Sequence, residues 1–417
     1  MRMVFNIGNF FTRLTFAFFT LFVSVVALKA ELPGQATAAV INAADYKSLQ
    51  AALNAVPSSG GMVRLPPGNF EIHEPLLLIT GETRITGAGS ATRIVNLNTN
   101  GQPALGIQPK DRAKKKNARI WRVQLDNFRI SGNTNSGDGI QANGVNEIYI
   151  HGVSVDRHGG HGINLTDCTE DPRVADSILT YNARAGLNIV NCHDIVVNGN
   201  HFEENQDAVR CSDSFNLCMN GNNVDDHLRH GVVIENTYGS VLSGNMIEEC
   251  NGVGIILDRD CYGITLSANV IAHHQGGGIQ MLGAWGCTIS ANTFVLVRSN
   301  SVLVSSNSGR LTITGNNFSN SYIGRGKTKR PIEHVNPIQL DESTGILLQS
   351  TSDIVISGNQ FSGLTGSAIR SEGTSKRLSV TGNIVTGTRN STGERSEAIF
   401  LKNPVSSVIK DNLITDK

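Results

Sequence analysis

Short runs of alternating apolar and polar residues recur along most of the chain. In the segments ITLS at 264–267 and LTIT at 311–314, apolar and polar residues take turns. An alternation with a period of two is typical of a β-strand that buries one face, and these runs are too short for helices. The pattern therefore predicts an all-β protein made of many short strands.

The strands belong to a repeat of about 23 residues that two ladders define. In the first ladder a small residue or Asp precedes Asn, any residue and an aliphatic residue or Phe, and its asparagines are Asn200, Asn222, Asn245, Asn269, Asn292, Asn316, Asn359, Asn383 and Asn412. In the second ladder a small residue precedes an aliphatic one, at Gly139, Gly162, Gly186, Ala208, Gly231, Gly254, Gly278, Ser301, Gly345, Ala368 and Ala398. Two ladders with one period predict a β-solenoid, whose rungs each hold two or three strands. Gly and Asn suit its corners because both tolerate a left-handed backbone.

Composition removes several other classes of protein. The chain has 417 residues, 44 of them glycine, and a formal net charge of zero. It is long enough to bury a large core, and a balanced charge gives no general attraction to polyanions, so we expect no nucleic-acid partner. Seven cysteines, an odd number, do not indicate a disulfide-stapled fold. We expect them to be buried, with Cys168 and Cys192 stacked as free thiols; a disulfide bridge between these two is the alternative.

The first thirty residues have the pattern of an export signal. Arg2 and Arg13 precede an apolar run from Leu14 to Leu28, and Ala27 and Ala30 offer small residues for cleavage. We therefore expect a secreted or periplasmic protein with no stable membrane insertion after cleavage of residues 1–30. The alternative is an uncleaved anchor, but a run of roughly fifteen residues is short for a bilayer span.

The N-terminal part of the mature chain resembles a known family. The stretch ADYKSLQAALNAVPSSGGMVRLPPGNFEIHEPLLL, followed by TRITGAGSATRI, is similar to the start of the right-handed parallel β-helices of the pectate lyase superfamily. The resemblance implies a short helix at about 46–54 that plugs the open end of the solenoid. It also implies a cap and first rung within 31–75 and a parallel β-helix over 76–417. A cap fits the physics, because a solenoid must shield its terminal strand edges and apolar face from water.

The repeat also predicts which side chains face outward. The residue after each small residue of the second ladder is aliphatic and inward, so the next one points outward. That outward column reads Gln141, Asn164, Asn188, Arg210, Val233, Ile256 and Gln280. Stacked polar side chains roughly 4.8 Å apart suit the hydroxyl groups of a sugar chain. We predict substrate binding by Asn164 and Asn188, together with Asp138 and His161 of the neighbouring column.

The column before the small residue offers catalytic candidates. It reads Asp138, His161, Ala185, Asp207, His230, Val253 and Gly277. The phrases NQDAV and LRHGV resemble those of polygalacturonases, in which an acid in one rung precedes a Gly-His-Gly in the next. This chain departs from them, because Gln206 stands beside Asp207 and because Asp138 lies three rungs away. Three rungs are about 14 Å, more than the roughly 6.5–9.5 Å of an inverting carboxylate pair. Hydrolysis is therefore disfavoured unless an acid at 203, 204, 225 or 226 reaches round the corner.

A lyase or epimerase requires less of the site. It needs a base for the proton next to a uronic carboxylate and a cation that neutralises this carboxylate. We predict that Asp207, His230, Arg210 and Arg229 supply both, with His230 suited to the proton step because an unperturbed histidine has a pKa near ~6.5. The structural alternative makes the histidines of this column turn residues bonded to backbone, and makes Asp207 a corner cap.

Metal sites have weaker signals. Asp258 and Asp260 in the phrase LDRDC, beside Glu235, offer oxygen ligands that would suit Ca²⁺, although a solvated edge has the same composition. His158 with His161, and His227 with His230, have a spacing of three that hints at metal ligation. We expect no other cofactor.

Basic segments favour an anionic polysaccharide as partner. They are PKDRAKKKNAR at 109–119 and GRGKTKRPIEH at 324–334; a third inserted loop, TRNSTGERSE at 388–397, carries two arginines and two glutamates. Solvated charge runs are the common alternative. The sequence thus predicts a secreted β-helix lyase or epimerase that acts on a uronic-acid-containing polysaccharide. The alternatives are a glycoside hydrolase of polygalacturonase type and a non-catalytic carbohydrate-binding or surface-structural solenoid. The last is favoured if the polar corner residues satisfy one another.

Overall fold

The computed structural model describes residues 38–319, 343–389 and 392–415. The predicted export signal at 1–30 and the basic segment at 324–334 lie outside these residues. Among the described helices, none has the length and apolarity that a bilayer crossing requires. The boundary predicted between residues 75 and 76 stays a prediction.

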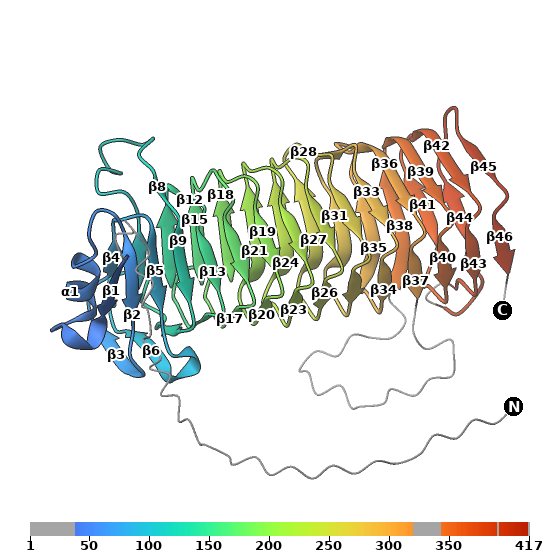
Figure 1. Cartoon of the computed structure of the whole chain (residues 1–417). Coiled ribbons are helices and arrows are strands. Elements are labelled where there is room, and N and C mark those ends of the chain that lie inside the picture. The colour runs from blue at the N-terminus through green and yellow to red at the C-terminus, as the bar shows by residue number, and fades with distance from the viewer. Residues whose placement is uncertain (1–37, 320–342, 390–391, 416–417) are drawn as a thin grey trace, which may run out of the picture. The chain divides into compact units, whose positions relative to one another are not determined.

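Nearly all regular structure is parallel β-sheet, and the chain visits three sheets in turn (Figure 1). Sheet A contains β1 (Ala39–Asn42), β2 (Gly61–Arg64), β5 (Thr83–Thr86), β9 (Val123–Asp126), β13 (Tyr149–His151), β16 (Arg173–Ala175), β19 (Val196–Asn198), β22 (Cys218–Asn220), β25 (Val241–Ser243), β28 (Cys261–Tyr262), β29 (Thr265–Ser267), β32 (Ala284–Trp285), β33 (Thr288–Ser290), β36 (Gly309–Thr314), β39 (Ser352–Ser357), β42 (Lys376–Thr381) and β45 (Val408–Lys410).

Sheet B follows sheet A in each turn of the chain. It contains β3 (Gly68–Ile72), β6 (Thr92–Asn96), β10 (Arg129–Ser131), β14 (Ser154–Asp156), β17 (Ile178–Thr180), β20 (His201–Glu203), β23 (Asn223–Asp225), β26 (Met246–Glu248), β30 (Val270–Ala272), β34 (Thr293–Val295), β37 (Asn317–Ser319), β40 (Gln360–Ser362), β43 (Ile384–Thr386) and β46 (Leu413–Thr415).

Sheet C completes each turn. It contains β4 (Leu76–Leu78), β7 (Leu105–Ile107), β11 (Ile140–Asn143), β15 (Ile163–Thr166), β18 (Leu187–Val190), β21 (Asp207–Ser212), β24 (His230–Glu235), β27 (Val253–Asp258), β31 (Gly277–Met281), β35 (Ser299–Val304), β38 (Ser343–Gln349), β41 (Ile369–Glu372) and β44 (Ile399–Leu401). A separate pair joins β8 (Ile120–Trp121) to β12 (Val145–Asn146).

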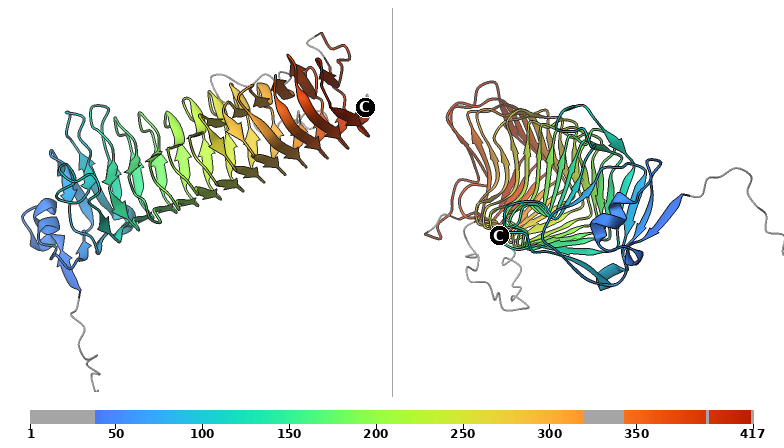
Figure 2. Two further views of the ribbon diagram at one scale, coloured as in Figure 1. Left: turned by 90° about the horizontal axis from the view of Figure 1, so that it is seen from above. Right: turned by 90° about the vertical axis from the view of Figure 1, so that its left-hand side faces the viewer.

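Each strand pairs in register with the equivalent strand of the next rung. In sheet C the inward aliphatic residues face one another in the order Ile140, Ile163, Leu187, Val209, Val232, Ile255 and Ile279. Because every rung repeats the same pattern, a parallel register places like residues on like residues. The chain is therefore the predicted parallel β-helix, and its turns stack along one axis (Figure 2).

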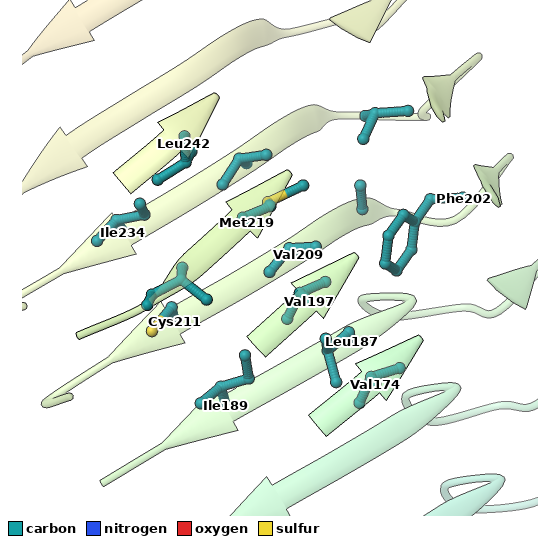
Figure 3. Packing of buried hydrophobic residues seen from close by; sticks show 14 of the residues in the cluster. Val174, Leu187, Ile189, Val197, Phe202, Val209, Cys211, Met219, Ile234 and Leu242 are labelled. Carbon is teal, nitrogen blue, oxygen red and sulfur yellow. The ribbon is translucent and has the colours of Figure 1, made fainter. Parts of the chain in front are cut away.

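The interior is a continuous aliphatic core (Figure 3). The aromatic rings of Phe294, Phe318 and Phe361 stack inside it with centroids 4.6 Å apart at each step. The predicted asparagine ladder is also continuous. From Asn200 to Asn412, each side-chain Nδ2 donates to Oδ1 of the next asparagine at 2.9–3.0 Å, and the next asparagine's Oδ1 also accepts a backbone N–H. The ladder satisfies buried polar groups at the corner between sheets A and B.

Two details of the prediction change. All seven cysteines are free thiols, including Cys168 and Cys192, but Cys218 is exposed rather than buried because its side chain faces outward from β22. The helix α1 covers Leu49–Asn54, with Ser48 as N-cap, and so begins later than predicted. Gln50 of this helix bonds to the backbone of Leu77 in β4; its role as a plug stays a prediction. Two 3₁₀ turns complete the helical structure, at Ala43–Asp45 and Gly89–Ala91.

Candidate functional site

The predicted catalytic residues surround one buried carboxylate where the chain passes from sheet B to sheet C. Asp207 pairs with His230 in the register of β21 and β24, and Asp207 is not exposed to solvent. Its Oδ1 accepts from the His230 backbone N–H at 3.1 Å and from Arg229 Nε at 2.9 Å. Its Oδ2 accepts from Arg210 Nη1 at 3.3 Å and from Arg229 Nη2. The structure therefore brings all four residues together.

The ion pairs continue along the outward face of sheet C. Glu235 accepts from Arg210 Nη2 at 2.8 Å and from Arg259 Nε at 3.1 Å. Arg210 thus bridges two carboxylates, and three guanidinium groups alternate with two carboxylates. The Arg229 and Arg259 side chains are 44% and 54% exposed, and Arg210 is 29% exposed. The Asp207 carboxylate of this cluster is buried, whereas the three arginine side chains are partly exposed to solvent.

Burial and charge act on the Asp207 carboxyl in opposite directions. Burial alone would raise its pKa, but the hydrogen bonds and charges of Arg229, the His230 backbone N–H and Arg210 lower it below its ordinary value. Asp207 is therefore ionised at neutral pH and already fully bonded. In this arrangement Asp207 acts as a positioning group that holds the guanidinium groups in place.

His230 has a defined tautomer. Its Nδ1 accepts the backbone N–H of Val253 at 3.0 Å, so the neutral ring carries its proton on Nε2. Burial lowers the pKa of His230, Asp207 raises it in part, and the two arginines lower it further. The imidazole is therefore neutral at neutral pH and presents an N–H donor. To act as the predicted base, the ring would have to release Val253 and move its proton to Nδ1.

The same corner arrangement occurs earlier in the chain. Asp138 Oδ1 accepts the His161 backbone N–H at 2.7 Å, and His161 Nδ1 accepts the Ala185 N–H at 3.2 Å. Here the other carboxylate oxygen accepts from amides, Asn164 Nδ2 at 2.8 Å and Gln141 Nε2 at 3.2 Å. The predicted substrate-binding residues thus form a second Asp–His unit in which neutral amides take the place of arginines.

The outward amides form a row, as predicted. Asn188 Nδ2 donates to Asn164 Oδ1 at 3.0 Å, and the row continues through Asn164 to Asp138. Gln141 belongs to this network but was not selected from the sequence, although it stands first in the outward column. Beyond Arg210 the column becomes apolar, and Val233 and Ile256 pack together with Val253 and Leu282. The outward face thus changes from amide to cationic to apolar over successive rungs.

The predicted calcium ligands Glu235 and Asp258 face each other in the register of β24 and β27, and both already have protein partners. Glu235 is engaged by two arginines, and Asp258 Oδ1 accepts the backbone N–H of Arg259 at 2.7 Å. Asp258 and Asp260 form no ligand cluster with Glu235 within the described ranges, where the groups with ligand atoms less than 4.8 Å apart are Glu248, Glu249 and His273, and Asp225, Asp226 and Glu249. Arg259 was missed as a partner of Glu235. The sequence shows that Arg259 is positively charged, but it does not show that the side chain extends to Glu235 in the preceding rung.

The histidines at 158 and 227 are wall residues and do not share a ligand site with His161 and His230 in the described part of the chain. His158 Nε2 bonds to the Ile130 carbonyl at 3.4 Å, and His227 Nδ1 to the Asn205 carbonyl at 3.2 Å. Burial lowers the pKa of both rings to about 4. The spacing of three that suggested metal ligation therefore places one ring in the core wall and the other at the corner.

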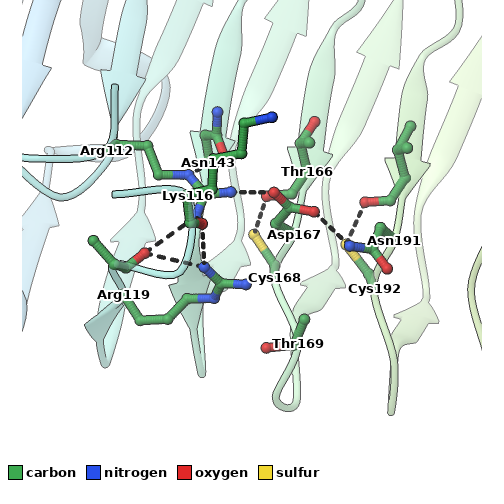
Figure 4. Close-up of polar contacts among 12 residues, drawn as sticks. Arg112, Lys116, Arg119, Asn143, Thr166, Asp167, Cys168, Thr169, Asn191 and Cys192 are labelled. Atoms are coloured by element: carbon green, nitrogen blue, oxygen red, sulfur yellow. Dashed lines mark hydrogen bonds and ion pairs between the residues drawn. The ribbon is translucent and has the colours of Figure 1, made fainter. Parts of the chain in front are cut away.

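The basic segment at 109–119 is anchored to sheet C through Arg112 (Figure 4). The buried Arg112 donates to Asn143 Oδ1 at 2.8 Å and to the Asp167 carboxylate. Four lysines of the segment are exposed, at 110, 114, 115 and 116. A buried arginine thus fixes a cationic loop at the edge of sheet C where the first amide-bearing strand ends.

Comparison with known proteins supports the fold and goes no further. A family model described as right handed beta helix region matches residues 84–239, and one described as periplasmic copper-binding protein (NosD) matches residues 173–333. No curated protein matches significantly. Each family model covers less than half of the chain, so together with the structure they show a right-handed parallel β-helix, the fold that the resemblance to the pectate lyase superfamily predicted.

Solved structures with this fold are distant in sequence. The tailspike protein of E. coli bacteriophage HK620, in complex with a pentasaccharide, is 15% identical with a TM-score of 0.56, covering 86% of this chain and 74% of its own. The mannuronan C-5 epimerase AlgE4 A-module of Azotobacter vinelandii is 14% identical, TM-score 0.51, with 90% and 100% covered. The DFA-IIIase of Arthrobacter chlorophenolicus A6, in complex with GF2, is 13% identical, TM-score 0.50, with 84% and 89% covered.

Proposed function

We propose that this chain is an exported β-helix protein that acts on a uronic-acid-containing polysaccharide, by β-elimination or epimerisation, at the corner of Asp207 and His230. The observation that carries the proposal is the pair of arginines, Arg210 and Arg229, that bind Asp207 from two adjacent rungs. Arg210 and Arg229 are fixed by a buried ionised carboxylate, remain partly exposed, and stand at the end of an outward row of amides.

The arrangement suits an acidic sugar. Arg229 uses Nε and Nη2 on Asp207, which leaves Nη1 for a sugar carboxylate. A guanidinium beside that carboxylate stabilises the negative charge that develops when the neighbouring carbon loses its proton. His230 offers an Nε2–H donor, which fits a hydrogen bond to the sugar carboxylate or the leaving oxygen; to take the proton from the neighbouring carbon, the ring would release the Val253 N–H and carry its own proton on Nδ1. Amides of the earlier rungs are suited to the hydroxyl groups of adjoining sugars.

The comparisons support a saccharide ligand. The similar structures are a mannuronan C-5 epimerase module, a tailspike bound to a pentasaccharide and a DFA-IIIase bound to GF2. The periplasmic description of the second family model agrees with the expected export. These likenesses support a saccharide ligand, and the arginine cluster favours an acidic one.

The copper-binding description of that family model fits the described residues less well. Burial raises the pKa of the Cys211 thiol to about 11 and of the Cys261 thiol to about 12, and burial also raises that of Cys250. These three thiols lie within the aliphatic core and are at most 1% exposed, away from the outer surface that an ion reaches. The ligand clusters in the described part of the chain contain carboxylates and His273, without cysteine.

A panel of acidic polysaccharides tests the proposal. Polygalacturonate, alginate and their oligomers are incubated with the protein and followed by ultraviolet absorbance, reducing-end assay and proton NMR. Absorbance from an unsaturated uronate indicates elimination, and a change in epimer ratio without chain cleavage indicates epimerisation. Reducing ends without absorbance would replace the proposal with hydrolysis.

A non-catalytic carbohydrate-binding role is the second candidate, and one observation favours it. Each charged group of the cluster already has a protein partner, and His230 Nδ1 is occupied by Val253. A site built for binding alone needs no free base. Binding of an acidic oligosaccharide with no change in absorbance, epimer ratio or chain length would select this role.

A further inference from the structure

We propose that the corner between sheets C and A carries a second, separate carbohydrate-binding surface, which takes a neutral polysaccharide lying along the helix axis. The surface, called the aromatic strip, consists of one aromatic residue in each of five consecutive rungs: His193, Phe215, Tyr238, Tyr262 and Trp285. Their backbones pair from rung to rung. The corner lies along the upper edge of Figure 1, where β28 contributes Tyr262.

The first three rings of the strip stack on one another; His193, Tyr238 and Trp285 are half-buried, and Phe215 and Tyr262 are exposed. His193 and Phe215 have centroids 5.3 Å apart with an interplanar angle of 30°, and Phe215 and Tyr238 are 6.0 Å apart at 16°. Phe215 is 41% exposed and Tyr262 is 56% exposed. Aromatic side chains normally bury most of their large surface, so a stacked row in contact with water is a feature that folding alone does not require.

The core does not need these rings. The residue before each of them is buried and closes the wall of the β-helix at this corner; these residues are Cys192, Ser214, Thr237, Cys261 and Ala284. The wall is complete beneath the strip, and removal of a ring leaves no cavity in the core. The strip is therefore available for an external ligand.

Polar side chains border the strip on both sides. On one side Asn191 donates to Asp167 at 2.5 Å (Figure 4), and Asn236 donates to Asp213 at 2.8 Å. On the other side Asn216 donates to Asp194 at 2.9 Å. Aromatic faces bordered by amides and carboxylates match a sugar ring, which has an apolar face and an equatorial rim of hydroxyl groups.

Further along, glycine opens the border. Gly239, Gly263 and Gly286 follow the ring-bearing residues, and all have positive φ, which glycine adopts without strain. A Cβ at position 286 would come within 3.1 Å of the Tyr262 ring. Gly263 and Gly286 therefore place no side chain beside the Tyr262 ring, whereas the Arg310 guanidinium lies over the Trp285 ring, with its Cζ 6.0 Å from the ring centroid.

The charge of the borders selects the ligand. The carboxylates of Asp194 and Asp213 would repel an acidic polymer, since like charges disfavour a partner, whereas Asp167 is ion-paired with Arg112. A neutral glycan meets no such penalty. Five rungs span about 19 Å, which corresponds to several sugar units and not to a single sugar. The strip thus differs from the arginine cluster in both charge and chemistry, and the inference does not rest on the proposed function.

Fluorescence gives a direct test, because the chain has two tryptophans, Trp121 and Trp285. In the W121F variant Trp285 is the sole tryptophan reporter. Cellohexaose, xylohexaose, mannohexaose and chitohexaose are titrated, with hexagalacturonate as the acidic comparison. At least one neutral oligosaccharide should change the emission of Trp285 in a saturable manner, whereas hexagalacturonate should leave it unchanged.

Substitutions locate the binding. Phe215→Ala and Tyr262→Ala should each weaken it by about tenfold or more, as expected for aromatic anchors, whereas Tyr262→Trp should retain it. Leu228→Ala is the matched control, because Leu228 is also exposed (60%) and lies on another corner. Thermal unfolding of the alanine variants checks the fold. A lack of response to all four neutral oligomers would overturn the inference, as would binding of the acidic oligomer alone, or self-association that Tyr262→Ala abolishes.

Discussion

Two corners of this β-helix carry the same pair of residues in different surroundings. At the first, Asp138 accepts the backbone N–H of His161; at the second, Asp207 accepts that of His230. In both, the histidine Nδ1 accepts an N–H from the next rung. The backbone geometry is thus shared, and a corner acid followed by a histidine is in the first place a way of satisfying backbone groups.

What differs is the chemistry around the second carboxylate oxygen. Amides of Gln141 and Asn164 occupy the first corner, and guanidinium groups occupy the second. An amide can accept as well as donate, whereas a guanidinium only donates and always carries its charge. The second corner therefore surrounds its carboxylate with fixed cations, and the first surrounds its carboxylate with uncharged, adaptable amides. The comparison separates what the fold requires from what function adds.

The largest expected effect is on turnover. Replacement of His230 by Ala should lower turnover of the acidic polysaccharide by about 10²–10⁴, the usual range for loss of a general acid or base. His161→Ala, at the corner whose carboxylate is bonded by amides, should change it less than tenfold. Rates with a single polymer at saturation check both. Equal losses in the two variants would show that both histidines are structural.

Stability should respond next. In Asp207→Asn the new amide places an N–H against Arg229, which has no acceptor to offer, so unfolding free energy should fall by about 3 kcal/mol, the low end for a broken buried ion pair because Arg229 is partly exposed. In Asp138→Asn the neighbouring amides can turn, and the loss should stay near 1 kcal/mol. Urea unfolding of the pair measures the difference. Similar losses would contradict the contrast drawn between the corners.

The smallest expected effect is the loss of folding stability at acidic pH, and here the two corners should behave alike. Beneath them lie His158 and His227, whose pKa values are lowered by burial from 6.5 to about 4. The unfolded chain takes up these protons below about pH 6.5, and the folded chain does so only near pH 4. Stability is therefore fully present above pH 6.5 and declines between these values.

His227→Asn tests this linkage. The substitution introduces the residue that Asn182 and Asn205 provide at the same position in earlier rungs. The melting temperature of the variant should depend less on pH between about 6.5 and 4, with the other histidines of lowered pKa, His158, His161, His230 and His274, contributing to the remaining slope. An unchanged slope would show that His227 does not resist protonation in the folded state.

The fold could be predicted because its determinants are periodic. The asparagine ladder and the small-residue ladder fix the register of every rung. Counting residues from the small-residue ladder therefore placed Asp207 and His230 at equivalent positions of adjacent rungs. The aromatic strip has the same spacing, 22, 23, 24 and 23 residues from His193 to Trp285, and was available to the same counting. Its signal was missed because the residue type changes from rung to rung.

The rest depended on side-chain reach and on hydrogen-bond direction. Sequence placed Glu235 near Asp258 but could not show that Arg210 and Arg259 both extend to Glu235. It placed His230 at the corner but not the Val253 N–H that occupies Nδ1 and turns a predicted base into a donor. Such features depend on distances of a few ångströms across rungs, which a repeat of residue types does not encode.

The central claim is that guanidinium groups make the second corner specific for an acidic sugar. Arg210→Gln gives this rung the residue that opens the outward column, Gln141, and so converts its chemistry to that of the first corner. Calorimetric titration with a hexagalacturonate and with a neutral hexasaccharide, on the wild type and on this variant, measures the claim directly. The account predicts that the variant binds the acidic oligomer at least tenfold more weakly, by about 1.4 kcal/mol, and binds the neutral one unchanged. Equal affinity of wild type and variant for the acidic oligomer would contradict it.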